Sequence, residues 1–441
     1  MKFRMTDGRD IIDFIRPLVN LPRSATGNGV RRTLDAVSQR LPIEVREYAS
    51  GKSVFDWVVP DEWNLRRATL SDSAGNLLAD TNDCVLHVMA HSMPFSGTLS
   101  LEELMPSLYS NETLPGVIPY RTSYYAKRWG ICLSHEAKMK LKEGSYDVSI
   151  DADLFAGHLT LGELLIPGKS TDEMVISTHI CHPFMANDNL AGLGLAVALF
   201  EWLSSRDNRL SYRLILAPGT IGAITWLAHN TEHAKQSIRH GLIATCVGDR
   251  GVIHYKHSRS GEATIDRAVK SVLESRKIPH KLLDFSPYGY DERQYNSPGF
   301  DLDFGVLSRS PNGGYPQYHT SADDLSILSE AAIDESLAVY KAVIELIDEQ
   351  TIPQVTPTKA TPIGKVYRST NLMCEPMLGK RGLYKTTGGA VHSPTRELAL
   401  LWVMNLADGH HGVADIVQRS KLSPVDIDAA VEALVGVGLL E

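Results

Sequence analysis

The pattern of apolar and polar positions changes character several times along this 441-residue chain. Near the start, Asp10 to Val19 and Val30 to Leu41 follow a helical period and are separated by a turn rich in Pro and Gly. Short alternating runs such as Val85 to Met89 and Gly116 to Tyr120 then predict a small β-rich domain over residues 51–139. A different pattern follows, in which apolar strand-like runs and helical periods take turns.

This second pattern, together with residues 1–50, predicts one domain extending over residues 140–350. Alternating strands and helices indicate an α/β fold whose mostly parallel sheet is covered by helices on both faces. The predicted strands include Tyr146 to Ile150, Gly157 to Ile166, Met174 to Thr178, Tyr212 to Ala217, Leu242 to Val247 and Phe304 to Leu307; the predicted helices include Ala263 to Arg276 and Ala322 to Ile347.

A Pro- and Thr-rich segment, IPQVTPTKATP, marks a linker that we place at residues 351–384. The remainder, residues 385–441, predicts three short helices at Thr395 to Asp408, Val413 to Ser420 and Pro424 to Gly436, an arrangement that resembles a winged-helix module. Its last helix carries three carboxylates and no Lys or Arg, so DNA phosphates would repel it. We therefore expect protein contact, self-association or packing from this module, and not DNA binding.

Composition and charge exclude several classes of function. A formal net charge of -8 and a pI near 6.1 provide no basic surface for nucleic acid or an anionic membrane. No apolar run approaches the length of a membrane span, and the first residues lack a signal-peptide core, which predicts a cytoplasmic protein. The five cysteines are scattered and predict neither disulfides nor a thiolate zinc site.

The candidate chemistry begins in the string EMVISTHICHPFMANDNLAGL, at Glu173 to Leu193. A buried strand leads directly into His179 and His182, and Asp188 follows just before an apolar helix. Such residues would gather at the carboxyl end of a parallel strand, where open α/β sheets bind ligands. Two imidazoles and a carboxylate suit Zn²⁺ and similar ions. Taken singly, the histidines are better explained as loop residues and Asp188 as a helix cap, and only the whole cluster favours a metal site.

Three later segments supply further groups. Asp249 follows the strand at Leu242 to Val247, and His319 in YPQYHTSADD precedes the last helix of the domain. The turn YDERQY adds Asp291, Glu292 and Arg293. Alone, Asp249 would be a turn residue and the charged turn a solvated loop.

The order of these motifs resembles that of the zinc aminopeptidases with a co-catalytic metal pair. Nearly the whole chain is similar to a branch of that clan with an inserted β domain and a winged-helix tail. The strings that carry this resemblance are DWVVPDEWN, PYRTSYY, WGICLS, STHICHP, ANDNLAG, YDERQY, YHTS and LGKRGLY. The resemblance implies a catalytic domain interrupted by the β insertion.

The resemblance also implies roles for individual residues around one or two zinc ions. His179 matches a ligand of one metal, Asp188 the carboxylate that bridges two metals, Asp249 a ligand of the first site and His319 a ligand of the second. His182 has no counterpart in the wider clan and could replace or supplement His179 as a ligand. Cys181 stands where the clan has an aspartate that orients the ligand histidine, a role for which a thiol is poorly suited.

A larger departure concerns the general base. The clan has a Glu-Glu pair where this chain has Gly219 and Thr220, neither of which can accept a proton from water. We expect Glu292 or Asp291 to serve as the base beside a single zinc ion. Candidate groups for holding a substrate carboxylate or a developing oxyanion are Arg293, Arg121, Lys256 and Arg259, each of which could equally be part of a structural ion pair.

The sequence is consistent with three functions. The leading one is a zinc-dependent hydrolase of a peptide or small amide, which uses metal-activated water as the nucleophile. The second is a catalytically silent binding or assembly protein, suggested by Gly219 and Thr220. The third is a transcriptional regulator that acts through the winged-helix tail.

Overall fold

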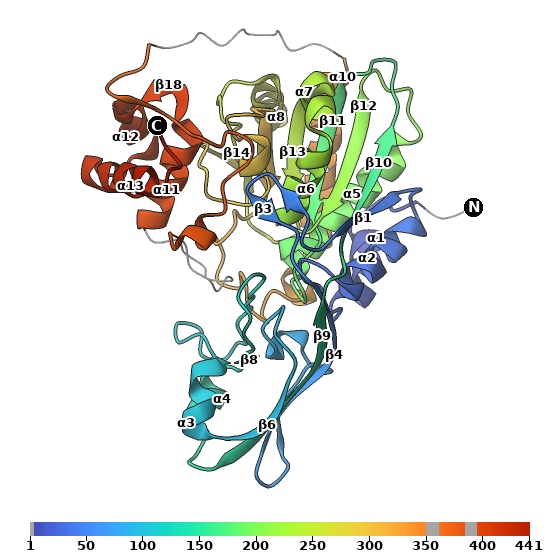
Figure 1. Cartoon of the computed structure of the whole chain (residues 1–441). Coiled ribbons are helices and arrows are strands. Elements are labelled where there is room, and N and C mark those ends of the chain that lie inside the picture. The colour runs from blue at the N-terminus through green and yellow to red at the C-terminus, as the bar shows by residue number, and fades with distance from the viewer. Residues whose placement is uncertain (1–3, 350–360, 384–394) are drawn as a thin grey trace.

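A computed structural model describes residues 4–349, 361–383 and 395–441 (Figure 1). Its centre is an eight-stranded sheet with the order β1-β10-β12-β11-β13-β16-β14-β15. The four middle strands are parallel, whereas β1, β10 and β14 each run antiparallel to a neighbour. The strands are β1 (Glu44–Ala49), β10 (His158–Ile166), β11 (Glu173–His179), β12 (Ser211–Ala217), β13 (Ile238–Ala244), β14 (Ile253–Lys256), β15 (His280–Leu283) and β16 (Phe304–Ser308). The predicted α/β fold with a mostly parallel sheet is confirmed.

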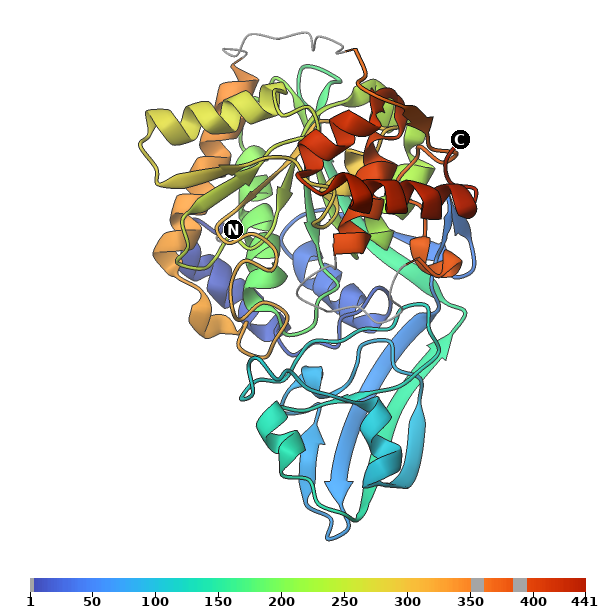
Figure 2. The ribbon, with the colours of Figure 1, turned by 90° about the vertical axis from the view of Figure 1, so that its left-hand side faces the viewer.

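Helices cover both faces of this sheet, as Figure 2 shows. On β11, Met174 and Ile176 face one hydrophobic core while Val175 faces another, which is the alternation expected of a strand buried on both sides. The first core is covered by α1 (Gly8–Ile15), α2 (Asn28–Ser38), α5 (Gly192–Leu203), α8 (Thr264–Ser275) and α10 (Glu330–Asp348), and the second by α6 (Ile221–His229) and α7 (Thr231–Ser237).

Two predicted boundaries differ from the structure. The strand expected to reach Val247 ends at Ala244. The helix expected from Ala322 begins only at Glu330, because Asp324 first accepts a hydrogen bond from the amide of Ser326 and forms a separate 3₁₀ turn. These shifts lengthen the loops beside the candidate site.

A second, antiparallel sheet projects from the main body, below it in Figure 1. Its strand order is β5-β4-β9-β6, and two eleven-residue strands, β4 (Glu62–Asp72) and β9 (Ser145–Phe155), connect it to the main body. It has its own hydrophobic core. The remaining elements of this region and its approaches are β2 (Ser53–Val54), β3 (Trp57–Val58), β5 (Leu77–Asp80), β6 (Phe95–Ser100), α3 (Leu101–Leu104), β7 (Leu108–Tyr109), β8 (Ile131–Cys132) and α4 (His135–Met139). A 3₁₀ turn, Val85–His87, replaces part of the strand expected at Val85 to Met89.

The C-terminal helices form a compact module with a two-stranded wing. It contains β17 (Val366–Arg368), α11 (Thr395–Leu406), β18 (Asp408–Gly412), α12 (Val413–Ser420) and α13 (Pro424–Gly436), packed around a core of their own. The first part of the predicted linker, residues 351–360, and its last residue, 384, lie outside the described residues. The part at residues 361–383 is structured, and the amides of Cys374 and Glu375 in it donate hydrogen bonds to Ser297 and Gln294 of the α/β domain. None of the helices in the described ranges is long and apolar enough to cross a bilayer.

Candidate metal centre and its cavity

Four polar side chains converge at the carboxyl end of the parallel strands. His179 is the last residue of β11, and His182 lies in the loop that follows. Asp188 belongs to the irregular turn Ala186–Ala191 that precedes α5, and His319 to the loop between β16 and α10. The topology therefore brings together residues that are separated by up to 140 positions in the sequence, at the edge where α/β sheets bind ligands.

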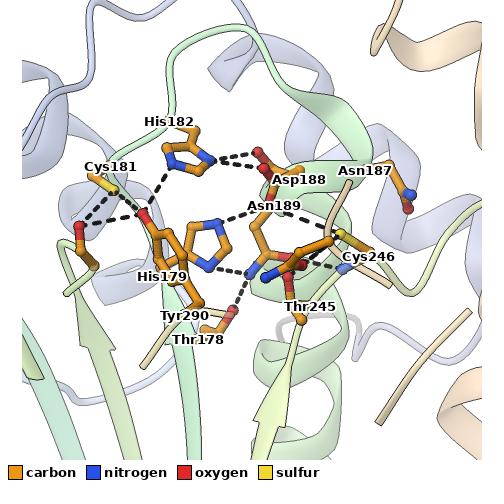
Figure 3. A network of polar contacts seen from close by, with 12 residues as sticks. Thr178, His179, Cys181, His182, Asn187, Asp188, Asn189, Thr245, Cys246 and Tyr290 are labelled. Carbon is orange, nitrogen blue, oxygen red and sulfur yellow. Dashed lines mark hydrogen bonds and ion pairs between the residues drawn. The ribbon is translucent and has the colours of Figure 1, made fainter. Parts of the chain in front are cut away.

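Asp188 is the centre of this group (Figure 3). Its Oδ1 atom lies 2.9 Å from Nε2 of His179, and its Oδ2 atom lies 3.0 Å from Nδ1 of His182 and 3.1 Å from Nε2 of His319. All four side chains are buried. His179, His182 and Asp188 each present a ligand atom within 4.8 Å of the other two.

The chemistry of these three groups fits a metal ion. Nε2 of His179 is buried and makes no hydrogen bond although it lies close to a carboxylate oxygen. Burial lowers the pKa of His179 to about 4 against the opposing effect of Asp188, so this imidazole is neutral near pH 7 and keeps a free electron pair. Burial alone would raise the pKa of Asp188, but His182 and His179 outweigh it and hold that pKa well below its usual range. Two imidazoles and a carboxylate form a ligand set that could bind a metal ion.

The turn that carries Asp188 is held by groups that the sequence analysis did not single out. Asp323 accepts hydrogen bonds from the amides of Asn187 and Asp188, at 2.6 and 3.2 Å. The side chain of Asn189 donates to Oγ1 of Thr178 at 2.7 Å. The string YPQYHTSADD contains Asp323, but only the fold brings it beneath a turn 135 residues earlier.

Asp249 does not join the group of ligand atoms. Its Oδ2 accepts a hydrogen bond from Asn187 at 2.8 Å, and its Oδ1 accepts from Gly251 and Ser310 at 2.6 and 2.9 Å. These bonds use its carboxylate to brace the loop after β13. Because β13 ends at Ala244, this aspartate is five residues beyond the strand and not directly at its end.

Tyr290 is a further member of the site that sequence analysis missed. Its hydroxyl lies 2.9 Å from Nε2 of His182, 3.1 Å from Sγ of Cys181 and 3.2 Å from the carbonyl of Gly219. With Nδ1 of His182 facing Asp188, Nε2 can carry the proton and donate it to the phenol oxygen. Such an outer contact orients a ligand histidine, so Tyr290 takes the role that the thiol of Cys181 performs poorly.

The same tyrosine explains the glycine at position 219. A Cβ atom on Gly219 would lie 1.8 Å from Cε1 of Tyr290. The phenol ring thus occupies the space that any side chain at position 219 would need, and a glutamate cannot be present there together with Tyr290.

Removing only the hydroxyl of Tyr290 should weaken metal binding without disturbing the packing of the ring. For Tyr290→Phe we expect an increase of about 10- to 100-fold in the dissociation constant for Zn²⁺, the usual effect of losing an outer contact to a ligand histidine. Competition with a chromogenic chelator measures this constant. Tyr255→Phe is a matched control, because its hydroxyl is bound to Asp266 and takes no part in the site; an unchanged constant in Tyr290→Phe would contradict the role of the hydroxyl.

The two candidate bases lie in different environments. Glu292 is buried in an ion pair with Lys256 and also accepts from the amide of Tyr290 at 3.0 Å. Asp291 is fully buried, and neither of its carboxylate oxygens has a hydrogen-bond partner. Burial, followed by the charge of Glu292, raises the pKa of Asp291 to about 8.

Of the four basic side chains considered for substrate binding, the structure places one at the site. Arg293 lines the cavity described below and lies 3.1 Å from Glu375. Lys256 is engaged by Glu292, and Arg259 binds Asn405 and Asp408 of the C-terminal module. Arg121 donates to the carbonyl of Tyr120 and is not among the residues that line the cavity.

A cavity of about 480 Å³ opens from the group of histidines. His182 and His319 are among its lining residues, and its walls come from three parts of the chain. The α/β domain, the inserted region and the segment before α11 all contribute. The lining residues are Trp57, Tyr120, Thr122, Tyr124, Tyr125, Ala126, His182, Gly219, Thr220, Ile221, Tyr290, Arg293, His319, Met377, Gly379 and Lys380. Both appended regions therefore shape the space above the candidate metal centre.

Comparison with known proteins gives matches over nearly the whole chain. A family described as "Domain of unknown function (DUF4910)" matches residues 12–350, and a family described as "winged helix-turn-helix" matches residues 365–441. A protein of Clostridium acetobutylicum, described as a "putative polysaccharide biosynthesis protein with aminopeptidase-like domain", is 40% identical over 437 residues, covering 98% of this chain and 96% of that protein.

Solved structures show the same fold. The crystal structure of a "putative peptidase" from Clostridium acetobutylicum is 39% identical, with a TM-score of 0.76 over 98% of this chain and 96% of that one. A zinc aminopeptidase from Bacillus subtilis is 12% identical, with a TM-score of 0.59 over 80% of this chain and 98% of that one. The second likeness concerns the fold alone. The fold of this chain is therefore aminopeptidase-like, with the winged-helix module added at residues 365–441.

Proposed function

Because this chain belongs to the DUF4910 family and has an aminopeptidase-like fold with a C-terminal winged helix, we propose that it is a zinc-dependent hydrolase of amide bonds. The observation that carries the proposal is the buried group of His179, His182 and Asp188 beside a cavity of about 480 Å³, which His182 helps to line. A purely structural role does not explain this group, because the burial of ionisable side chains costs free energy of folding. Clusters of buried ionisable groups are typical of functional sites.

Each residue of the site would have a distinct role. His179, His182 and Asp188 would hold the zinc ion, which when bound would supply a Lewis acid for the amide carbonyl and lower the pKa of water. His319, 3.1 Å from Asp188, would contact the same carboxylate from the cavity side. Tyr290 would orient His182, and the aromatic walls of the cavity would exclude bulk water from the scissile bond.

We assign the role of proton acceptor to Asp291. A general base works best with a pKa near the working pH, which burial provides for Asp291. Glu292 is the less suitable group, because its carboxylate is engaged by Lys256. Asp291 also adjoins Tyr290, which lines the cavity.

The two carboxylates can be separated by mutation. Asp291→Asn should lower kcat by about 10²- to 10⁴-fold with unchanged zinc content. Glu292→Gln should weaken a buried charged hydrogen bond and destabilise the fold by about 1–3 kcal/mol, with a smaller effect on kcat. Steady-state rates and urea unfolding of both variants measure these effects; the opposite ranking of the two rates would assign the base to Glu292.

A catalytically silent binding protein is the second candidate. It is favoured by Gly219 and Thr220, which stand in place of a Glu-Glu pair, and by the ring of Tyr290 beside Gly219. Zinc analysis and an amide-hydrolysis assay on the metal-replete protein distinguish the two. Stoichiometric zinc with turnover supports the hydrolase, stoichiometric zinc without turnover on any amide supports the silent protein, and less than stoichiometric zinc counts against a metal-dependent function.

A further inference from the structure

The charge of the cavity bears on the class of substrate. Among the residues described in the structure, no aspartate or glutamate lines the cavity, whereas Arg293 and Lys380 both do. An aminopeptidase must bind the free α-ammonium of its substrate, for which a carboxylate is the natural partner. The charged residues that line this cavity are cationic and would not attract an ammonium group.

The carboxylates that pair with the lining residues Lys380 and Arg293 are already engaged, and Asp291, which has no hydrogen-bond partner, is assigned to proton transfer. Asp56 accepts a hydrogen bond from the amide of Met377 at 2.7 Å and is bound by two cations, Lys380 at 2.7 Å and Arg381 at 2.5 Å. Two positive charges therefore share one negative charge, and this wall keeps a net positive charge. Glu375 is paired with Arg293, so it does not supply a free anion either.

The remaining walls are aromatic. Trp57 belongs to β3, and Tyr124 and Tyr125 to the loop between β7 and β8. Tyr120 packs its ring 5.2 Å from that of His182. These rings provide apolar surface for a hydrophobic or aromatic substituent close to the candidate metal centre. Aromatic rings also attract ammonium groups. In this cavity, however, an ammonium group would lie beside Lys380 and Arg293, which would repel it.

We propose that the substrate is an N-acylated amine that carries a carboxylate and an apolar or aromatic group, and that has no free α-ammonium. This proposal rests on the hydrolase function and refines it from aminopeptidase-like to deacylase. Water adds to the acyl carbon, the C–N bond breaks, and the leaving amine takes a proton, which yields one carboxylate and one amine. The substrate carboxylate would lie toward Lys380, and its apolar group would pack against the aromatic walls.

Four compounds that share the phenylalanine side chain test the charge preference. N-acetyl-L-phenylalanine and N-acetyl-L-phenylalaninamide lack an ammonium group, whereas glycyl-L-phenylalanine and glycyl-L-phenylalaninamide carry one. Calorimetric titration into the zinc-loaded full-length protein should show N-acetyl-L-phenylalanine binding at least about 10-fold more tightly than glycyl-L-phenylalaninamide, the effect of about one charge-assisted contact. The order of kcat/KM should be the same.

The mutant Lys380→Gln should reduce the preference for the carboxylate over the neutral amide by about 5- to 10-fold. Lys270→Gln is the matched control, because Lys270 lies on the exposed side of α8 and its loss should leave the preference unchanged. Tighter binding of glycyl-L-phenylalaninamide, or no binding of any of the four compounds, would overturn the proposal. Because binding is measured apart from turnover, protein that binds the acetylated acid without hydrolysing any compound would contradict the hydrolase function and leave the charge preference supported.

Discussion

Replacing Asp188 by asparagine should abolish tight zinc binding and, with it, amide hydrolysis. Asp188 lies within 3.1 Å of three imidazoles and is the only carboxylate in the group of His179, His182 and Asp188. The neutral amide of asparagine removes the negative charge that balances the cation. Loss of an outer contact to a ligand raises the dissociation constant for Zn²⁺ by up to roughly 100-fold. We expect the loss of Asp188, a ligand itself, to raise this constant further.

Thermal or urea unfolding with and without zinc measures this effect independently of catalysis. A ligand at 100 times its dissociation constant stabilises the native state by about 2.7 kcal/mol, and a variant that no longer binds should gain almost nothing. Asp207→Asn is the matched control, because Asp207 forms only an exposed pair with Lys169. Equal stabilisation of the wild type and Asp188→Asn by zinc would show that the ion binds elsewhere.

The second large effect concerns Gly219 and Tyr290, which we expect to be strongly coupled. Gly219→Ala alone should destabilise the protein by about 1–3 kcal/mol or more, because its Cβ would overlap the phenol ring. In a Tyr290→Ala background the ring is absent, and most of this cost should disappear. The coupling free energy of the double-mutant cycle should therefore reach about 1–3 kcal/mol.

Urea unfolding of the two single variants and the double variant provides the cycle. Gly436→Ala serves as the control, since nothing lies within 4 Å of its Cβ position. Additive effects would mean that the ring moves freely away from Gly219. In that case the ring of Tyr290 would not explain why this chain has Gly219 where the clan has a glutamate.

Local patterns were sufficient to predict the frame of the site. The apolar run of β11, the two histidines after it and the Asp-Asn pair before α5 lie within 21 residues, so their arrangement depends mainly on one strand and one turn. The winged-helix module and the mostly parallel sheet were likewise predicted from periodicity. His319 required the order of motifs, because it reaches Asp188 from 131 positions away.

The rest of the site depends on tertiary contacts between loops. Tyr290 meets His182 across 108 residues, and no local pattern distinguishes it from the other tyrosines in the loop. Asp249 was expected among the ligands because its strand seemed to end beside it, but the strand stops earlier and the carboxylate binds Asn187 instead. Arg259 pairs with Asp408 of the C-terminal module. No local sequence pattern predicts how this module packs against the α/β domain.

A zinc-edge anomalous difference map from crystals of the full-length protein grown with zinc tests the central claim most directly. We expect one strong peak within coordinating distance, about 2.0–2.2 Å, of a ring nitrogen of His179, a ring nitrogen of His182 and a carboxylate oxygen of Asp188. A map without a peak at these three side chains, or with its only strong peak at another place, would contradict that claim.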